Sequence, residues 1–320
     1  MVRRLLVLVL FAGLPATLLA QAYPNRALKI VVTFAAGGSA DLVARAVNGP
    51  LSAALGQPVV IDNRAGAGGT LGAGLVAQAE PDGYTLLFSA TGPNAIAPGL
   101  QKALPYDPVK GFAGISRISI QPAIIVVNAE LAARDVNELV ALAKASPGKL
   151  NFSSPGQGTS SHLGGELFKM LAGVQMEHIP YKDGRLAVTD VVGGRINVMF
   201  DNIGTFLPHI RSGRLRALAI AADRRSPLLP NVPTAAEAGL AGYEYSIWFG
   251  LAAPATTPAP IVALLNAKLV EALKAPAVTE RLAALNAELS TTTPAETDRF
   301  VASEIQKWGK VIKTAGLAAQ

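Results

Sequence analysis

Residues 28–41 read LKIVVTFAAGGSAD, and this stretch decides the predicted fold. Its first half, Leu28–Phe34, is apolar and rich in β-branched residues, which is typical of a buried strand. Gly37 and Gly38 then free the backbone to turn, and a helix is predicted from Ser39 to Leu55. A strand that passes through a glycine turn into a helix is the repeating unit of a parallel α/β sheet.

The strand–helix order continues as far as one long β-rich segment. Strands at Pro58–Asp62 and Thr85–Ser89, with a glycine-rich turn and a helix between them, complete a βαβαβ unit. This order predicts a parallel sheet with helices on both faces. Phe112–Asn128 is long and β-rich without a clear helix, and we interpret it as the crossing into a second lobe.

The α/β order then restarts, which predicts a second lobe. Short apolar runs predict strands at 150–153, 176–181, 196–201 and 215–222, and helical patterns occur at 136–145, 159–171 and 186–192. A strand at 246–252 returns to the first lobe, and two helices, at 261–273 and 294–314, close the chain. We therefore predict an α/β fold of two doubly wound lobes, with lobe 1 formed by residues 23–122 and 245–320 and lobe 2 by residues 123–244.

Residues 1–22 predict a secretory signal peptide. Arg3 and Arg4 give a positive start, residues 5–14 are an unbroken apolar run, and residues 20–22 form an A-x-A cleavage signal. The apolar run is shorter than the roughly 20 residues that span a bilayer, and an uncleaved anchor is the alternative. We expect the mature chain to begin at Tyr23 and to reside in the periplasm.

The composition favours a folded, exported binding protein. Half of the 320 residues are hydrophobic and only 16% are charged, which argues against disorder. The chain has no Cys and therefore neither an acylation site nor a disulfide, as suits a periplasmic protein with a large core. Without Arg3 and Arg4, the formal net charge of +6 falls to +4. Because Lys and Arg are scattered, we expect small anionic ligands and no nucleic acid.

Two loops are candidates for ligand binding. Residues 34–41 and 153–162 each follow a strand, contain glycines and lead into a helix. Unpaired N–H groups at a helix start attract anions, and ligands of α/β sheets bind at the carboxyl ends of the strands. Two such loops facing each other would hold a small carboxylate. The alternative is two ordinary helix starts, with Ser39 and Thr159 as N-caps and Asp41 complementing the helix dipole.

Motifs for other chemistries are missing from the sequence. The Gly66–Gly69 run lacks the third glycine of a dinucleotide motif, and neither a phosphate-binding loop nor a nucleophile elbow occurs. The three histidines lack metal-ligand spacing: His162, His178 and His209. We therefore expect no cofactor, no metal and no catalysis. An exported hydrolase that uses Ser39, Ser160 or His162 is the alternative.

A series of ordered motifs extends over nearly all of the mature chain. It comprises FAAGGSAD (34–41), LGQPVV (55–60), NRAGAGG (63–69), PDGYTL (81–86), GQGTSSHLGGE (156–166), IPYK (179–182) and LPNVPT (229–234). In this order the series resembles the extracytoplasmic solute receptors of tripartite tricarboxylate transporters, the Bug or TctC family. So many ordered matches are far more specific than any single glycine motif.

The resemblance implies a type II periplasmic-binding fold with two lobes joined by two crossing strands. It implies capture of a small carboxylate, a di- or tricarboxylate or an aromatic acid, mainly through backbone amides and ordered water. The partners would be the membrane subunits of a tripartite transporter, and we expect a monomer; a sensor that feeds a two-component system is the alternative. The family's ligand loops, with Tyr181, give these candidate binding residues: Phe34, Gly37, Gly38, Ser39, Ala40, Asp41, Ser89, Thr91, Asn94, Gly156, Gly158, Thr159, Ser160, Ser161, His162, Tyr181, Asp201 and Asn202.

Two loops depart from the family's usual pattern. Ala36 stands where the first loop usually has Pro. After Tyr181 the family usually continues Lys-Gly-x-x-Pro-Ala, whereas this chain has Asp183, Arg185 and Leu186 in that run. Asp183 and Arg185 would add charge near the mouth of the cleft, so the ligand preference can differ there; a solvated charged turn is the alternative.

Overall fold

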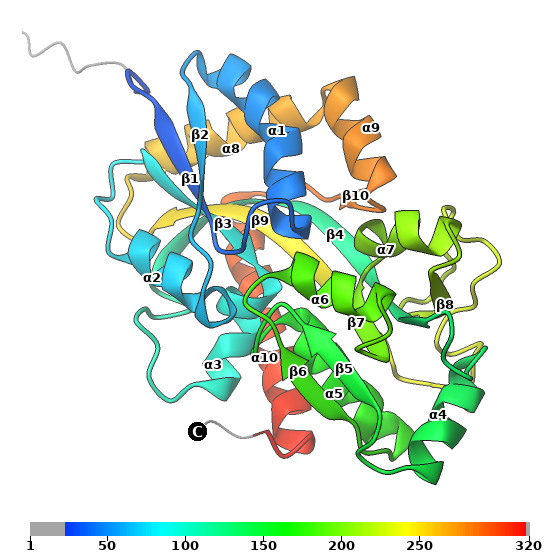
Figure 1. The fold of residues 1–320 in the computed structure, drawn as a ribbon. Coiled ribbons are helices and arrows are strands. Elements are labelled where there is room, and N and C mark those ends of the chain that lie inside the picture. The colour runs from blue at the N-terminus through cyan, green and yellow to red at the C-terminus, as the bar shows by residue number, and fades with distance from the viewer. Residues whose placement is uncertain (1–22, 318–320) are drawn as a thin grey trace, which may run out of the picture.

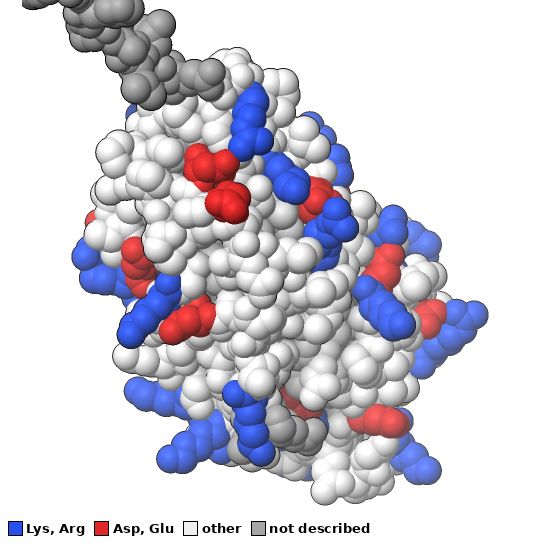
Figure 2. All heavy atoms as spheres, turned by 90° about the vertical axis from the view of Figure 1, so that its left-hand side faces the viewer, with Lys and Arg blue, Asp and Glu red and all other residues white. Residues whose placement is uncertain are grey.

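The computed structural model describes residues 23–317, so the predicted signal peptide lies outside the described residues. This part of the chain forms two α/β lobes that lie side by side (Figure 1). On the face shown in Figure 2, positive and negative side chains are interspersed and separated by uncharged surface. No helix between residues 23 and 317 is long and apolar enough to span a bilayer.

Lobe 1 is built on three parallel strands. Strand β1 (Leu28–Val32) lies between β2 (Val59–Asn63) and β3 (Thr85–Ala90) and pairs in parallel with both. Strand β9 (Ser246–Pro254) pairs antiparallel with β3. Alternate residues of β1 face two apolar clusters. One cluster contains residues of α1 (Ser39–Leu55), α8 (Ala259–Leu273) and α9 (Pro276–Ala284), and the other contains residues of α2 (Thr70–Ala77).

One long strand, β4 (Phe112–Asn128), runs through both lobes. Up to Pro122 it pairs antiparallel with β9, and from Ala123 onward it pairs with two strands of lobe 2. The structure therefore contains the crossing segment that the sequence predicts, with the predicted bounds. Because β4 changes its neighbouring strands between Pro122 and Ala123, the pairing supports a lobe boundary at this point. The boundary itself remains a prediction.

Lobe 2 repeats the parallel arrangement. Strand β5 (Asn151–Ser154) pairs in parallel with β6 (Glu177–Pro180) and β7 (Val198–Asn202). Strands β7 and β8 (Leu215–Ile220) both pair antiparallel with β4. Two apolar clusters cover opposite faces of this sheet. One contains residues of α4 (Val136–Ala145) and α5 (Ser160–Ala172), and the other contains residues of α6 (Gly184–Val192) and α7 (Ile203–Arg211).

All strands join in one sheet, and the last helix spans the junction between the lobes. The strand order is β2-β1-β3-β9-β4-β7-β5-β6, with β8 and the short β10 (Glu288–Leu289) also paired to β4. Helix α10 (Pro294–Thr314) begins with a capping box between Thr293 and Glu296. Trp308 of α10 and Trp248 of β9 are buried in the lobe 2 core, and both indole N–H groups donate to Glu304 Oε2, at 3.2 and 3.1 Å.

Most predicted elements are present, and the differences have local causes. Helices α1, α4 and α10 have the predicted bounds, and Pro50 lies within α1 without ending it. The predicted glycine-rich turn at Gly66–Gly69 contains one short helical turn, η1 (Ala67–Gly69), in which the glycines adopt left-handed backbone angles, and it leads into α2 as expected. The sequence analysis missed α7 and α9, each nine residues long and therefore short for periodicity to reveal.

Candidate functional site

A cavity of about 1120 Å³ lies between the two lobes. Its walls are loops at the carboxyl ends of the parallel strands, together with the first residues of the helices that follow them. Lobe 1 contributes segments 34–42, 65–69 and 90–92, and lobe 2 contributes segments 155–161, 180–185 and 199–205. Ligands of open α/β sheets bind at this edge of the sheet, so the cavity is the candidate binding site.

Four helices begin at this cavity. They are α1 in lobe 1 and α5, α6 and α7 in lobe 2. The first N–H groups of an α-helix have no acceptor inside the helix. Among the described residues, none accepts a hydrogen bond from the backbone N–H of Ser39, Ala40, Ser160 or Ser161. Their partial positive charges therefore converge on one space, which favours an anionic guest.

The α1 loop is held by a buried carboxylate. Gly38 is the N-cap and gives no side-chain cap, so Ser39 is not the N-cap considered from the sequence. Asp41 accepts hydrogen bonds from the Gly37 N–H and Arg45 Nε, both at 2.8 Å, and from Asn63 Nδ2 at 3.0 Å. Burial opposes ionisation of Asp41, but these hydrogen bonds outweigh it and hold the pKa of Asp41 below its usual value.

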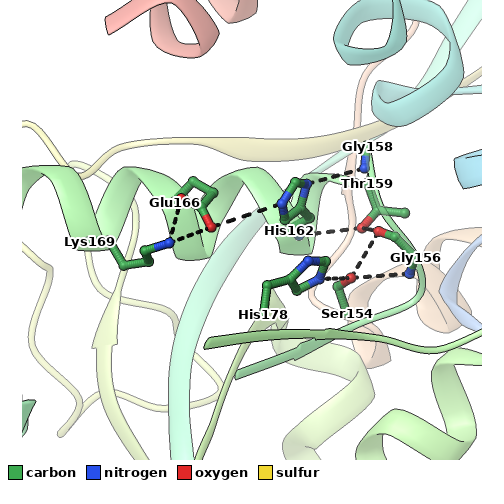
Figure 3. A network of polar contacts seen from close by, with 8 residues as sticks. All are labelled: Ser154, Gly156, Gly158, Thr159, His162, Glu166, Lys169 and His178. Carbon is green, nitrogen blue, oxygen red and sulfur yellow. Dashed lines mark hydrogen bonds and ion pairs between the residues drawn. The ribbon is translucent and has the colours of Figure 1, made fainter. Parts of the chain in front are cut away.

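The α5 loop is held by neutral polar groups (Figure 3). Thr159 is the N-cap, as considered from the sequence: its Oγ1 accepts from the His162 N–H at 3.3 Å and donates to the Gly156 carbonyl at 2.7 Å. His162 Nδ1 accepts a hydrogen bond from the Gly158 N–H at 3.2 Å. Because Nδ1 accepts this hydrogen bond, it carries no proton of its own. The loop geometry therefore selects the neutral form of His162.

A second histidine lies against the first. The rings of His162 and His178 stack with centroids 4.1 Å apart, and His178 Nε2 lies 2.7 Å from Ser154 Oγ. Burial lowers the pKa of His162 to about 4, with a further contribution from Lys169. Burial, His162 and Lys169 lower the pKa of His178 to about 3. Both rings are therefore neutral near pH 7 and act as rigid supports behind the loop.

A carboxyl group also lines the cavity. Asp201, at the end of β7, accepts from Ser161 Oγ at 2.7 Å, from the Asn202 N–H at 2.7 Å and from Asn202 Nδ2 at 2.9 Å. Burial raises the pKa of Asp201, and the three hydrogen bonds only partly offset it. Asp201 therefore offers a ligand a hydrogen-bonding group with less tendency to ionise than an exposed carboxyl.

The structure brings most of the predicted binding residues together. Those that line the cavity come from both lobes: Phe34, Gly37, Gly38, Ser39, Ala40, Thr91, Gly156, Gly158, Thr159, Ser160, Ser161, Tyr181, Asp201 and Asn202. Four others do not line it and hold the loops from behind: Asp41, Ser89, Asn94 and His162. Asn94 Oδ1, for example, accepts from the Ala90 N–H at 3.0 Å, and Ser89 and Asn94 border a separate small cavity of about 60 Å³.

Sequence reasoning missed one wall of the cavity. The Ala65–Gly69 loop of lobe 1 lies against lobe 2, so closely that a Cβ atom added at Gly68 would collide with the Gln157 carbonyl oxygen. The signal was the glycine run, which was interpreted as a turn before a helix and as a family motif but not as part of the binding site. Trp248, an aromatic residue that could have covered a ligand, is buried away from the cavity, whereas Phe249 lines it.

Comparison with known proteins identifies the family. The family model described as tripartite tricarboxylate transporter family receptor matches residues 43–317. The chain belongs to this family. Protein BugT of Bordetella pertussis is 40% identical to this receptor over 320 residues, covering 99% of this chain and 98% of BugT. The resemblance drawn from the sequence motifs is thus confirmed.

Solved structures support the same assignment. The receptor is similar to the periplasmic binding protein BugD, with 35% identity, a TM-score of 0.89 and coverage of 93% of this chain and 100% of BugD. It is also similar to MatC from Rhodopseudomonas palustris with bound malate, with 36% identity, a TM-score of 0.87 and coverage of 91% and 100%. These similarities confirm the predicted fold class of periplasmic binding proteins.

Proposed function

We propose that this receptor captures a small carboxylate in the periplasm and presents it to the membrane subunits of a tripartite transporter. The observation that carries the proposal is the convergence of four helix N-termini, from both lobes, on one cavity. MatC, which shares the fold, has malate bound in its solved structure. A di- or tricarboxylate or an aromatic acid is the corresponding ligand class here.

The binding groups follow from the hydrogen bonds that are already made. The Gly37 N–H already donates to Asp41. The free amides of lobe 1 therefore begin at Ser39, although Gly37 is among the binding residues predicted from the sequence. In lobe 2 the amides of Ser160 and Ser161 are available, whereas the Thr205 hydroxyl on the wall already donates to Asn202 Oδ1 at 3.1 Å. Backbone amides fixed by a folded loop bind a carboxylate without reorganisation, which supports affinity.

The wider role rests on the family and on the chain's N-terminal sequence. Residues 1–22 would direct export and be removed, leaving a mature receptor in the periplasm. The receptor would act as a monomer that closes on its ligand, and the closed form would be the one that the membrane subunits bind. We propose no catalytic step for it.

A hydrolase is disfavoured by the position of its best nucleophile–base pair. Ser154 Oγ and His178 Nε2 lie 2.7 Å apart, but Ser154 is 0% exposed and does not line the cavity. The Ser154 hydroxyl also lies 2.9 Å from the Gly156 carbonyl, as a donor within the loop. Ser39 and Ser160 do line the cavity, yet in the described part of the chain neither contacts a histidine.

Calorimetry against a panel of mono-, di-, tri- and aromatic carboxylates tests the proposal. We expect the wild type to bind at least one acid, and Gly68→Ala to weaken that binding about tenfold or more, because the new Cβ forces the lobes apart at Gln157. Gly56→Ala is the matched control: its φ of +67° equals the +66° of Gly68 within a degree, and no atom lies within 4 Å of the new Cβ. A wild type that binds no acid, or equal losses in both variants, would contradict the proposal.

A further inference from the structure

Arg185 reaches across the mouth of the cavity. It lies in the first turn of α6 in lobe 2, lines the cavity, and has a side chain 62% exposed. Its Cδ and Nη1 atoms lie 3.3 and 3.5 Å from the position that a Cβ on Gly37 would occupy. The guanidinium therefore lies against the loop that precedes α1, on the opposite lobe.

Asp183 holds one edge of this guanidinium and leaves the other open. Asp183 accepts from Arg185 Nε at 3.3 Å and from Arg185 Nη2 at 2.7 Å, and as the N-cap of α6 it also accepts from the Arg185 N–H at 2.9 Å. No oxygen within residues 23–317 accepts a hydrogen bond from Nη1. Because a guanidinium has five N–H donors in a rigid plane, the Nη1 side keeps its full donor capacity and faces lobe 1.

The acidic groups nearby do not satisfy this open edge. Asp41 is the acidic residue of lobe 1 that acts on Arg185 electrostatically, but its oxygens already accept from Gly37, Arg45 and Asn63. Lys182 adds a second positive charge to the cavity wall. Arg185 and Lys182 thus face the carboxylate of Asp183 next to a helix N-terminus, while the second carboxyl group of the cavity wall, Asp201, has less tendency to ionise than an exposed one.

We propose that Arg185 is a specificity-determining residue that binds a second anionic group of the ligand, so that the receptor favours dicarboxylates over monocarboxylates. The proposal rests on the proposed function, because the first carboxylate must be held by the helix N-termini. A carboxylate matches the free edge of a guanidinium in shape and charge, and the contact excludes a neutral group of the same size.

Paired ligands measure the contribution of the second charge. Calorimetry compares succinate, glutarate, adipate and pimelate with the monomethyl ester of each, which keeps the chain length and one carboxylate. For the best-fitting length, we expect the wild type to bind the diacid about ten- to a hundredfold more tightly than its monoester. In Arg185→Gln the two affinities should become equal within about threefold, and Arg185→Lys should keep part of the preference.

Two further variants separate ligand binding from indirect effects. Arg225→Gln removes another lobe 2 arginine, paired with Glu237 at 2.8 Å and away from the cavity, and should leave the preference unchanged. Asp183→Asn combined with Arg185→Gln removes both charges of the pair. If Arg185 binds the ligand, this double variant shows no preference. A return to the wild-type preference would mean that Arg185 only neutralises Asp183, and would overturn the proposal.

The outcomes for the wild type distinguish this proposal from the proposed function. A wild type that binds monoesters as tightly as diacids leaves carboxylate capture standing and removes the role of Arg185. A wild type that binds neither these diacids nor their monoesters, but does bind a tricarboxylate or an aromatic acid, overturns the dicarboxylate preference alone, and one that binds no acid of either panel contradicts both.

Discussion

The α1 loop and the α5 loop open on the same cavity, but different chemistry holds each in place. At α1, the ionised Asp41 accepts hydrogen bonds from the loop amide of Gly37 and from Arg45. At α5, a neutral histidine accepts from the loop amide of Gly158, and a second histidine stacks behind it. Two helix starts with similar sequences can therefore present similar amides while responding differently to acid.

The largest expected effect is acid destabilisation that originates at the α5 loop. The pKa values of His162 and His178 in the folded state, about 4 and about 3, lie below the ordinary histidine value of 6.5, so the unfolded chain binds more protons between these pH values. Their stabilising contribution is fully present above pH 6.5 and is lost as the pH falls through this window. Together they should lower the free energy of unfolding by about 3 to 4 kcal/mol between pH 7 and pH 5.

Urea unfolding at several pH values measures this slope. His162→Leu should flatten it by about half, whereas His209→Asn, at a more exposed histidine, should keep most of it. The α1 loop should respond in a different window: the pKa of Asp41 is held below 3.8, so its contribution persists above that value and is lost only below it. An equal slope in wild type and His162→Leu would contradict the assignment of acid sensitivity to α5.

The next effect breaks the α1 loop. Asp41→Ala leaves the Gly37 N–H without its acceptor and Arg45 without its partner, and Asn63 Nδ2 keeps only the Phe34 carbonyl, so the free energy of unfolding should fall by about 3 kcal/mol at pH 7. Asp62→Ala is the control, since Asp62 forms a surface pair with Arg64 and should cost about 1 kcal/mol or less. Chemical unfolding of both variants measures the two losses in free energy of unfolding. Comparable losses would show that Asp41 contributes no more to stability than a carboxylate in a surface pair.

The corresponding change at α5 should cost somewhat less. His162→Leu removes the acceptor of the buried Gly158 N–H, and we expect a loss of about 2 kcal/mol at pH 7, where the histidine is neutral. His162→Gln can still offer an oxygen to this N–H and should recover part of the loss. If Gln were no better than Leu, the hydrogen bond to Gly158 would not be the source of the effect.

The smallest effect compares the two helix caps directly. Thr159→Ala removes a side-chain cap and should cost about 1 kcal/mol, whereas Ser39→Ala should change stability by less than about 0.5 kcal/mol, because Gly38 is the cap at α1. Thermal or urea unfolding without ligand suffices as the measurement. Equal costs would mean that Ser39 caps α1 in solution.

The sequence predicted the elements that carry their own local signals. Helix α10 has its predicted bounds because Thr293 and Glu296 form a capping box, and β4 has them because its seventeen residues are rich in Ile and Val and lack helical periodicity. Helix α7 was missed, since its N-cap, Asn202, is also the last residue of β7, and since the helix contains Pro208. Short helices with a proline resemble loops when only local patterns are available.

The binding loops were predictable, but their support was not. Glycines followed by a helix start identified both the α1 and the α5 loops, and the family motifs added Thr91 and Asp201. The stacking of His162 on His178 joins α5 to β6, and the contact of Gly68 with Gln157 joins the two lobes. Such contacts depend on how distant segments pack, and no local pattern encodes them. Asp41 and His162 were accordingly expected to face a ligand, although both face inward.

The position of the chain's two tryptophans has a spectroscopic consequence. Trp248 lies on a strand that crosses between the lobes, Trp308 lies on the helix that spans the junction, and both donate to one oxygen of Glu304. Neither lines the cavity. Direct contact with a ligand in the cavity therefore cannot quench them, so a change in intrinsic fluorescence on binding would report altered packing where the two tryptophans meet Glu304.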